Sequence, residues 1–270
     1  MRGEVKADPA PALRISKVTK FFNRGSSIER RALNDIDLSL AEGDFAVVIG
    51  SNGAGKSTLL GVVAGDVSAD SGSVTICDVV VTDVPVHRRA HLVARVFQDP
   101  ARGTAPGLTV EENLAIAYKR GLRRYLNAAL TQDRRKLFRE TLAPLGLGLE
   151  QRLDTRVDLL SGGQRQALSL TMACLLKPAI LVLDEHCTAL DPRTAEAVMA
   201  ATFNAVRSSR ITTIMVTHNM HHAIEHGNRL IMMHEGGIVL QAADAEKSGM
   251  TVESLVQRFR TADDKLLLVR

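Results

Sequence analysis

FAVVIGSNGAGKST, residues 45–58, is the stretch of this 270-residue sequence that decides its fold. The continuous apolar run at 45–49 is typical of a buried strand, and the pattern at 59–65 is typical of a helix. Between them, residues 50–57 fit the P-loop pattern completely. A chance Gly-rich turn is the alternative, but a strand before and a helix after are the context that a P-loop requires.

The residue types of this loop suit a phosphate group. Glycines let the backbone fold tightly so that several N–H groups point inward, and the following helix adds the positive end of its dipole. Lys56 can reach the β- and γ-phosphates, Ser57 can ligate Mg²⁺, and Thr58 can donate to a phosphate. The predicted nucleotide-binding residues in this stretch are Gly50, Ser51, Asn52, Gly53, Ala54, Gly55, Lys56, Ser57 and Thr58.

A second chemical element is the aliphatic run ILVLDE at 180–185, which ends in two adjacent carboxylates. Successive strand residues point to opposite sides, so the two acids have different tasks. Asp184 can hold Mg²⁺, directly or through water, and Glu185 can act as general base on the attacking water. An acidic turn after a strand is the alternative, because this motif is weak alone.

A third element is LSGGQ at 160–164. A serine N-cap, two glycines and a helix start form another anion-binding helix terminus, with Ser161, Gly162, Gly163 and Gln164 as its residues. One nucleotide rarely needs two such sites, so we expect this one to close on the nucleotide of a second copy. The alternative is a capped helix after a flexible turn.

The rest of the sequence predicts an α/β core with a helical insertion and an antiparallel β edge. Strands are expected at 13–22, 32–40, 45–49, 71–77, 94–98, 180–183 and 211–216, and a hairpin at 229–240. Helices are expected after a capping box at Thr109–Glu112, over 119–143, over 164–176, from Asp191-Pro192, and over 251–260. We expect a flexible tail at 1–12, a helical subdomain at about 100–176, and a C-terminal tail at 261–270.

With the P-loop, LSGGQ and the two acids following one another in that order along the chain, the stretch 13–260 resembles the ATP-binding-cassette (ABC) ATPases. The resemblance implies the ABC ATPase fold, a P-loop NTPase core with an antiparallel β subdomain and a helical insertion. It also implies roles at matching positions. Gln98, after Val96-Phe97, is similar to the glutamine that senses Mg²⁺ and the γ-phosphate. Asp191, in Ala189-Leu190-Asp191, is similar to the D-loop aspartate at the dimer seam.

The resemblance implies two further contacts to the nucleotide. His218 is similar to the switch histidine that holds the γ-phosphate, and Phe22 to the aromatic that stacks on adenine, with Phe21 as the other candidate. The expected catalytic residues are thus Lys56, Gln98, Glu185 and His218, and the expected metal ligands are Ser57, Gln98 and Asp184. One departure is His186-Cys187, where the family usually has Pro-Thr or Pro-Ser.

The composition limits the cellular compartment in which such a protein works. The formal net charge is +4, and no apolar run approaches the roughly 18 to 20 residues that span a bilayer. The start is polar and the three cysteines are far apart, so we expect a protein of a reducing compartment. The resemblance implies that it is peripheral on the cytoplasmic face of the inner membrane. The basic stretch 119–139 is either a solvated helix face or a contact to anionic lipid.

These features predict the ATP-hydrolysing subunit of a bacterial transporter. Two copies would pair head to tail as a homodimer around two MgATP and work on separate permease subunits. LDEH, VTHNM and MMHEG resemble ATPases of importers whose permeases are similar to the branched-chain amino-acid type, with a substrate-binding protein as a further partner. An exporter or lipoprotein-release system, a nucleic-acid-acting ABC ATPase and a non-catalytic interaction module are the alternatives; no nucleic acid is expected as a partner.

Overall fold

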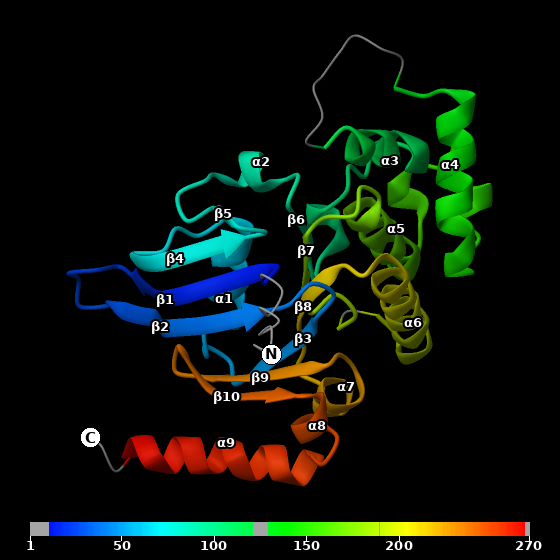
Figure 1. Ribbon diagram of the computed structural model, residues 1–270. Helices are drawn as coiled ribbons and strands as arrows, with labels where there is room; N and C mark the ends of the chain where they lie inside the picture. The colour runs from blue at the N-terminus through cyan, green and yellow to red at the C-terminus, as the bar shows by residue number, and fades with distance from the viewer. Residues whose placement is uncertain (1–10, 121–128, 189, 268–270) are drawn as a thin grey trace, which may run out of the picture.

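A computed structural model describes residues 11–120, 129–188 and 190–267, without the side chains of 259, 260 and 262–267. Two β-sheets enclose helix α1, Lys56–Ala64, and a group of helices stands to one side of them (Figure 1). The first hydrophobic core lies between the sheets, where α1 contributes Leu59, Leu60 and Val63 to a cluster with strands of both.

The larger sheet carries the predicted P-loop. Its order is β10-β9-β3-β8-β7-β6, and all neighbouring pairs are parallel except β10 with β9. Its inner strands are almost continuously apolar because helices or the other sheet cover both faces. The strands are β3 Phe45–Gly50, β6 Val93–Val96, β7 Ile180–Asp184, β8 Thr212–Val216, β9 Arg229–His234 and β10 Gly237–Ala243.

The smaller sheet is antiparallel and has the order β2-β1-β4-β5. Its strands alternate between buried and exposed residues over much of their length because one face packs on α1. The strands are β1 Leu13–Phe22, β2 Arg30–Leu40, β4 Ser71–Ile76 and β5 Val79–Val80.

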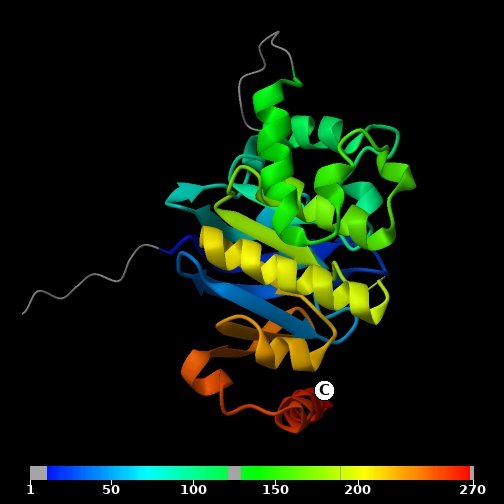
Figure 2. The ribbon, with the colours of Figure 1, turned by 90° about the vertical axis from the view of Figure 1, so that its right-hand side faces the viewer.

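The helices form two groups. α3 Val110–Tyr118, α4 Gln132–Leu142 and α5 Gly162–Cys174 share a core centred on Phe138 and Leu142. The outer face of the larger sheet is covered by α5, by α6 Pro192–Ser209, which lies across it in Figure 2, and by α7 Met220–Glu225. The remaining helices are α2 Val86–Arg89, α8 Asp244–Lys247, α9 Val252–Leu267, and the 3₁₀ turns η1 Pro100–Arg102, η2 Ala143–Leu145, η3 Leu149–Gln151 and η4 Val157–Leu159.

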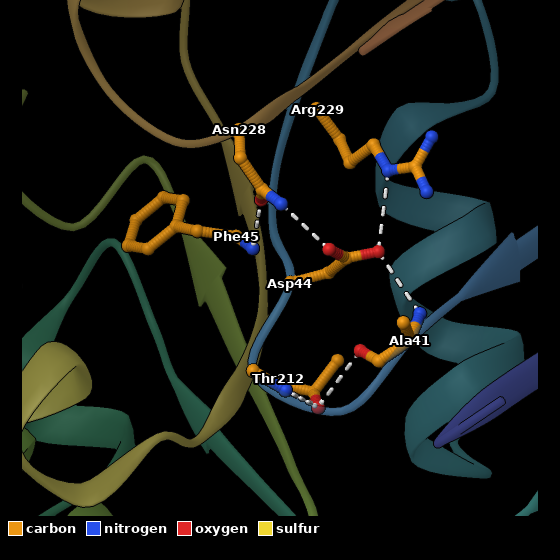
Figure 3. A network of polar contacts seen from close by, with 7 residues as sticks. Ala41, Asp44, Phe45, Thr212, Asn228 and Arg229 are labelled. Atoms are coloured by element: carbon orange, nitrogen blue, oxygen red, sulfur yellow. Dashed lines mark hydrogen bonds and ion pairs between the residues drawn. The ribbon is translucent and has the colours of Figure 1, made fainter. Parts of the chain in front are cut away.

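The amino-terminal ends of the parallel strands β3 and β9 are joined by the buried carboxylate of Asp44 (Figure 3). Asp44 accepts hydrogen bonds from Ala41 N at 2.9 Å and from Asn228 Nδ2 at 2.6 Å, and it pairs with Arg229 Nε at 3.2 Å. Asn228 Oδ1 in turn accepts from Phe45 N at 2.7 Å. This network fixes β3 and β9 at the end opposite to the P-loop.

The structure confirms the predicted α/β architecture and the Thr109–Glu112 capping box, and it corrects four boundaries. The helix predicted over 119–143 begins only at Gln132, because Thr131 caps it, and 121–128 lie outside the described residues. The helix predicted at 164–176 spans 162–174. α9 continues to Leu267, so residues 261–267 are helical and not a tail. Ala12 is already buried in the core. The other domain limits stay predictions.

Candidate functional site

The P-loop is a turn that only glycine can make. Gly53 and Gly55 have φ of +84° and +100°, in the region that side chains strain. A Cβ on Gly55 would also lie 2.4 Å from Ala32 O, and one on Gly50 would lie 2.5 Å from Met233 O. The loop is therefore clamped between β2 and β9, and it delivers Lys56 as the first residue of α1.

Lys56 is folded into this loop. Its Nζ donates to Gly50 O at 2.7 Å and to Ser51 O at 3.0 Å, and the side chain is buried. Burial lowers the pKa of Lys56, while the carboxylates of Glu185 and Asp184 act in the opposite direction. A phosphate in the loop would take the ammonium group from two backbone carbonyls, which makes the exchange inexpensive. Ser57 and Thr58 follow on the same turn and are accessible.

The sheet topology gathers the other predicted chemical residues around the loop. β3, β8, β7 and β6 are parallel neighbours, so the residues after their carboxyl ends lie along one edge. His218 follows β8, Glu185 follows β7 and Gln98 follows β6. His218 Nε2 lies 2.6 Å from Glu185 Oε1, so the predicted base and the predicted switch histidine are in contact.

Glu185 has an unusual backbone. Its φ is +47°, a left-handed conformation that costs a residue with a side chain about 1 kcal/mol or more. Its N–H donates to Val216 O at 3.2 Å, and its own carbonyl accepts from Thr188 N at 3.1 Å. The strand β7 thus ends in a tight turn that directs the Glu185 carboxylate toward His218.

Asp184 pairs with a residue that the sequence analysis does not select. Arg95 Nη2 lies 2.6 Å from Asp184 Oδ2, and Arg95 Nη1 lies 2.6 Å from Asp66 Oδ2. Arg95 belongs to β6, next to β7 in the sheet, and its side chain is only 14% exposed. A cation in an otherwise apolar strand is the signal that could have identified it.

The predicted metal ligands have suitable chemistry for Mg²⁺. Ser57, Gln98 and Asp184 offer hydroxyl, amide and carboxylate oxygens, the hard donors that this ion prefers. Arg95 engages Oδ2 of Asp184, so a metal ion would use the other oxygen. Mg²⁺ bound there would neutralise phosphate charge and polarise the bond to be broken.

The LSGGQ motif opens α5 as predicted. Ser161 Oγ accepts from Gln164 N, and Gln164 Oε1 accepts from Ser161 N, both at 3.2 Å. Gln164 also donates to Leu147 O, and a Cβ on Gly163 would lie 2.1 Å from Thr194 Cγ2. Gln164 and Gly163 therefore build the helix start, whereas Ser161 is exposed and Gly162 has room beside it. In the described part of the chain, no hydrogen bond joins 161–164 to the P-loop.

A second residue that the sequence analysis misses is Gln166. It is 1% exposed, and its Nε2 donates to Phe97 O at 3.1 Å. The helix that starts at the LSGGQ motif thereby holds the backbone immediately before Gln98, which is itself exposed. A polar residue on the buried side of α5 was the available signal.

The geometry distinguishes the two phenylalanines at the end of β1. Phe21 carries the guanidinium groups of Arg24 and Arg31 over its ring, at 5.3 and 5.5 Å from the centroid. Phe22 is 39% exposed, with Lys20 Nζ 5.7 Å from its centroid. Phe22 is the more exposed of the two rings, and the stacking of adenine on it stays a prediction.

Asp191 is the N-cap of α6, as the Asp-Pro pair predicts. Its Oδ1 accepts from Thr194 N at 3.1 Å, and hydrogen bonds from Thr194 hold the pKa of Asp191 below its usual range. The side chain is exposed at the start of the helix. Ala189, the first residue of the predicted D-loop, lies outside the described residues.

The departure at 186–187 is accommodated by burial. His186 is 2% exposed, and burial, with the nearby charge of His222, lowers its pKa to about 4. Burial raises the pKa of Cys187 to about 12. A cavity of about 590 Å³ adjoins this turn, and Glu185, His186, Met199 and His218 are among its lining residues.

Comparisons with known proteins identify the relatives of this chain. The family model described as "ABC transporter" matches residues 33–188. A "Tyrosine transport ATP-binding protein" of Clostridioides difficile is 41% identical over 93% of this chain and 99% of its own length. A "Sulfate/thiosulfate import ATP-binding protein CysA 2" of Agrobacterium fabrum is 32% identical over 92% of this chain and 68% of its own.

Solved structures give the same result. A dimeric ATP-binding cassette in a post-hydrolysis state, bound to ADP and Pi, has a TM-score of 0.73 at 26% identity and covers 86% of this chain and 98% of its own. The ADP conformation of a cassette of an ABC transporter has a TM-score of 0.71 at 25% identity and covers 91% and 98%. Among the described helices, none has the length and apolarity to cross a bilayer. The chain belongs to the ABC transporter family and is an ATPase of that family.

Proposed function

We propose that this ATPase powers import of an amino-acid-like solute through separate permease subunits, with Glu185 as the base of hydrolysis. The observation that carries the chemical part is the contact between Glu185 and His218 at 2.6 Å, at the strand edge where the P-loop begins. A carboxylate held by a histidine beside a phosphate loop is suited to orienting water for attack on the terminal phosphate.

The roles of the chain's own residues follow from their positions. Lys56 leaves the carbonyl oxygens of Gly50 and Ser51 to pair with the β- and γ-phosphates. Glu185 accepts the proton of the attacking water. His218 donates a hydrogen bond to the γ-phosphate instead of to Glu185. Asp184, Ser57 and Gln98 would hold Mg²⁺, and Phe22 would stack on the adenine.

We infer that the working unit is a homodimer. Ser161 and Gly162 face outward at the positive end of α5, where they can meet a nucleotide bound by another copy. Asp191 is exposed at the start of the neighbouring α6. The similar cassette with ADP and Pi is dimeric, which supports the same arrangement here.

The direction of transport is proposed from relatives. The similar proteins include one named for tyrosine transport and others named for import of sulfate or polyamines. An amino-acid-type permease, including the branched-chain class that the sequence resembles, is the proposed membrane partner, and a substrate-binding protein would deliver the solute. The ATPase would then lie at the cytoplasmic face of the inner membrane.

Replacing Glu185 by Gln tests the chemical part. This change keeps the shape of the side chain and removes the base, so we expect unchanged ATP affinity, no phosphate release, and a stable dimer in the presence of ATP on size-exclusion chromatography. Lys56→Ala is the matched control and should lose nucleotide binding as well as turnover. Hydrolysis at the wild-type rate by Glu185→Gln would show that another group is the base.

Import itself needs the native partner. Affinity purification of the tagged chain from membranes should recover a permease, and vesicles reconstituted with both, with the ATPase and ATP on the inside, should accumulate solute from the outside. Export of solute from those vesicles would contradict the proposed direction while leaving the ATPase chemistry intact.

A further inference from the structure

The residue after Glu185 is tied to a helix on the far side of the turn. His186 Nε2 lies 3.1 Å from Thr202 Oγ1, inside α6, and both side chains are buried. Thr202 Oγ1 itself donates to Val198 O at 2.8 Å, the carbonyl one helical turn earlier. A hydroxyl has one hydrogen, so these two contacts are satisfied together only if His186 Nε2 carries a hydrogen and donates it to Thr202.

Glu185 needs such an anchor. Its left-handed backbone is a strained conformation that persists only when its surroundings over-determine it. The N–H of Glu185 donates to Val216 O in β8, and the carbonyl of Glu185, in the peptide to His186, accepts from Thr188 N. The ring of His186 adds a side-chain contact at the same end of the turn, because it is fixed to α6 by the hydrogen bond to Thr202.

The cavity beside the turn explains why the anchor matters. It is lined by Glu185, His186, Thr188 and His218, so the turn is not packed tightly on this side. Without the His186 contact, the turn could relax into that space and carry the Glu185 carboxylate away from His218. The 2.6 Å contact between base and switch histidine would then be lost.

We propose that His186 is a positioning residue, whose hydrogen bond to Thr202 holds the turn of Glu185 so that its carboxylate meets His218 and the attacking water. This role rests on the proposed function of Glu185 as base. It assigns a task to the position where this chain departs from the usual proline of the family: a side-chain tether to α6 supplies the rigidity that a proline ring supplies through its fixed φ.

The test removes the tether without touching the base. Thr202→Val keeps the side-chain volume and deletes the hydroxyl, and Thr202→Ser is the matched control that keeps the hydroxyl. We expect Thr202→Val to lower kcat about tenfold, since small misplacements of catalytic groups are costly. ATP affinity, measured with a fluorescent nucleotide, should stay unchanged, and Thr202→Ser should behave as the wild type.

A second pair of variants changes His186, the other partner of the hydrogen bond. His186→Gln retains an N–H at a similar reach and should keep most of kcat, whereas His186→Leu should lose it. Because both changes remove one interaction, the double variant His186→Leu with Thr202→Val should be no slower than His186→Leu alone. Circular dichroism at the assay temperature checks that each variant is folded. If the hydrogen bond between His186 and Thr202 had a purely structural role, its loss would lower Tm and leave kcat unchanged.

The outcomes separate this inference from the proposed function. Wild-type kcat in Thr202→Val beside an inactive Glu185→Gln would overturn the role of His186 alone. Full turnover by Glu185→Gln would overturn the base and the positioning role together. The positioning role of His186 would also be overturned if the losses of kcat in the two single variants multiplied in the double variant, because the two side chains would then act independently.

Discussion

Replacing Arg95 by Met is the perturbation whose effect can be worked out most fully from the structure. Arg95 bridges Asp184 and Asp66 through two contacts of 2.6 Å. Methionine keeps much of the aliphatic length of arginine and removes its charge. The Asp184 carboxylate then stands next to Glu185 without its cation, and we expect the folded state to lose stability in the absence of metal ions.

The size of the loss follows from burial. The side chains of Arg95 and Asp184 are 14% and 17% exposed, so their contact is a partly buried charged hydrogen bond worth about 1.5–3 kcal/mol. Asp66 is 39% exposed, and solvent screening reduces its share to below about 1 kcal/mol. With roughly 2–4 °C per kcal/mol for a chain of this size, Tm should fall by about 3–16 °C.

Adding Mg²⁺ tests whether the loss of positive charge causes the fall in Tm. A divalent cation at Asp184 supplies the positive charge that Arg95→Met removes, so the Tm deficit seen in EDTA should shrink when Mg²⁺ and a non-hydrolysable ATP analogue are added. Differential scanning fluorimetry under both conditions measures it. Asp66→Asn is the control that breaks only the outer contact, and its deficit should stay small. Equal Tm values for wild type and Arg95→Met in EDTA would refute the reasoning, and so would a deficit that Mg²⁺ leaves unchanged.

Three other predictions use separate parts of the molecule. Asp44→Ala leaves Ala41 N and the side chains of Asn228 and Arg229 without their buried acceptor, so the free energy of unfolding should fall by about 2–4 kcal/mol in urea titrations. Since Asp44 lies at the opposite strand ends, an altered kcat in the still-folded variant would contradict our view of that network. Gly163→Ala places a methyl group 2.1 Å from Thr194 Cγ2 and should cost about 1–3 kcal/mol, whereas Gly162→Ala, 3.5 Å from Leu190 Cδ2, should be nearly neutral to stability. Burial raises the pKa values of Cys174 and Cys187 to about 12, so iodoacetamide should label exposed Cys77 first. Even at pH 9 the other two thiols are almost entirely protonated, so their labelling should stay far slower than that of Cys77, and mass spectrometry of quenched samples would reveal early labelling of Cys187 if this is wrong.

The parts of the site that lie within one continuous motif could be predicted from the sequence. Gly50 to Thr58 need a strand before them and a helix after them, and both are visible as apolar runs. Ser161 and Asp191 could be placed as helix caps because capping depends on residues at most three positions away. In each case the physical cause and the sequence signal are local.

The contacts that join separate motifs could not be predicted in this way. Arg95 meets Asp184 only because β6 and β7 become neighbours, with Arg95 opposite Val182 in the register. Gln166 reaches Phe97 only because α5 crosses the end of β6. The choice between Phe21 and Phe22 likewise depends on where β2 places Arg31. The helix predicted over 119–143 was too long because the basic stretch has helix-forming residues, while the cap at Thr131 decides where α4 begins.

These missed contacts converge on the strand end that precedes Gln98. Gln166 holds the carbonyl of Phe97 from the LSGGQ helix, and the guanidinium groups of Arg95 and Arg102 lie 4.8 and 4.7 Å from the centroid of the Phe97 ring. Arg95 in turn holds Asp184. If the serine-led end of α5 meets the nucleotide of a second copy, as proposed, a shift of α5 would act on Phe97 and, through Arg95, on Asp184. Gln166, Phe97 and Arg95 thus form a continuous chain of contacts from the LSGGQ helix to Asp184, which no single motif of the sequence encodes.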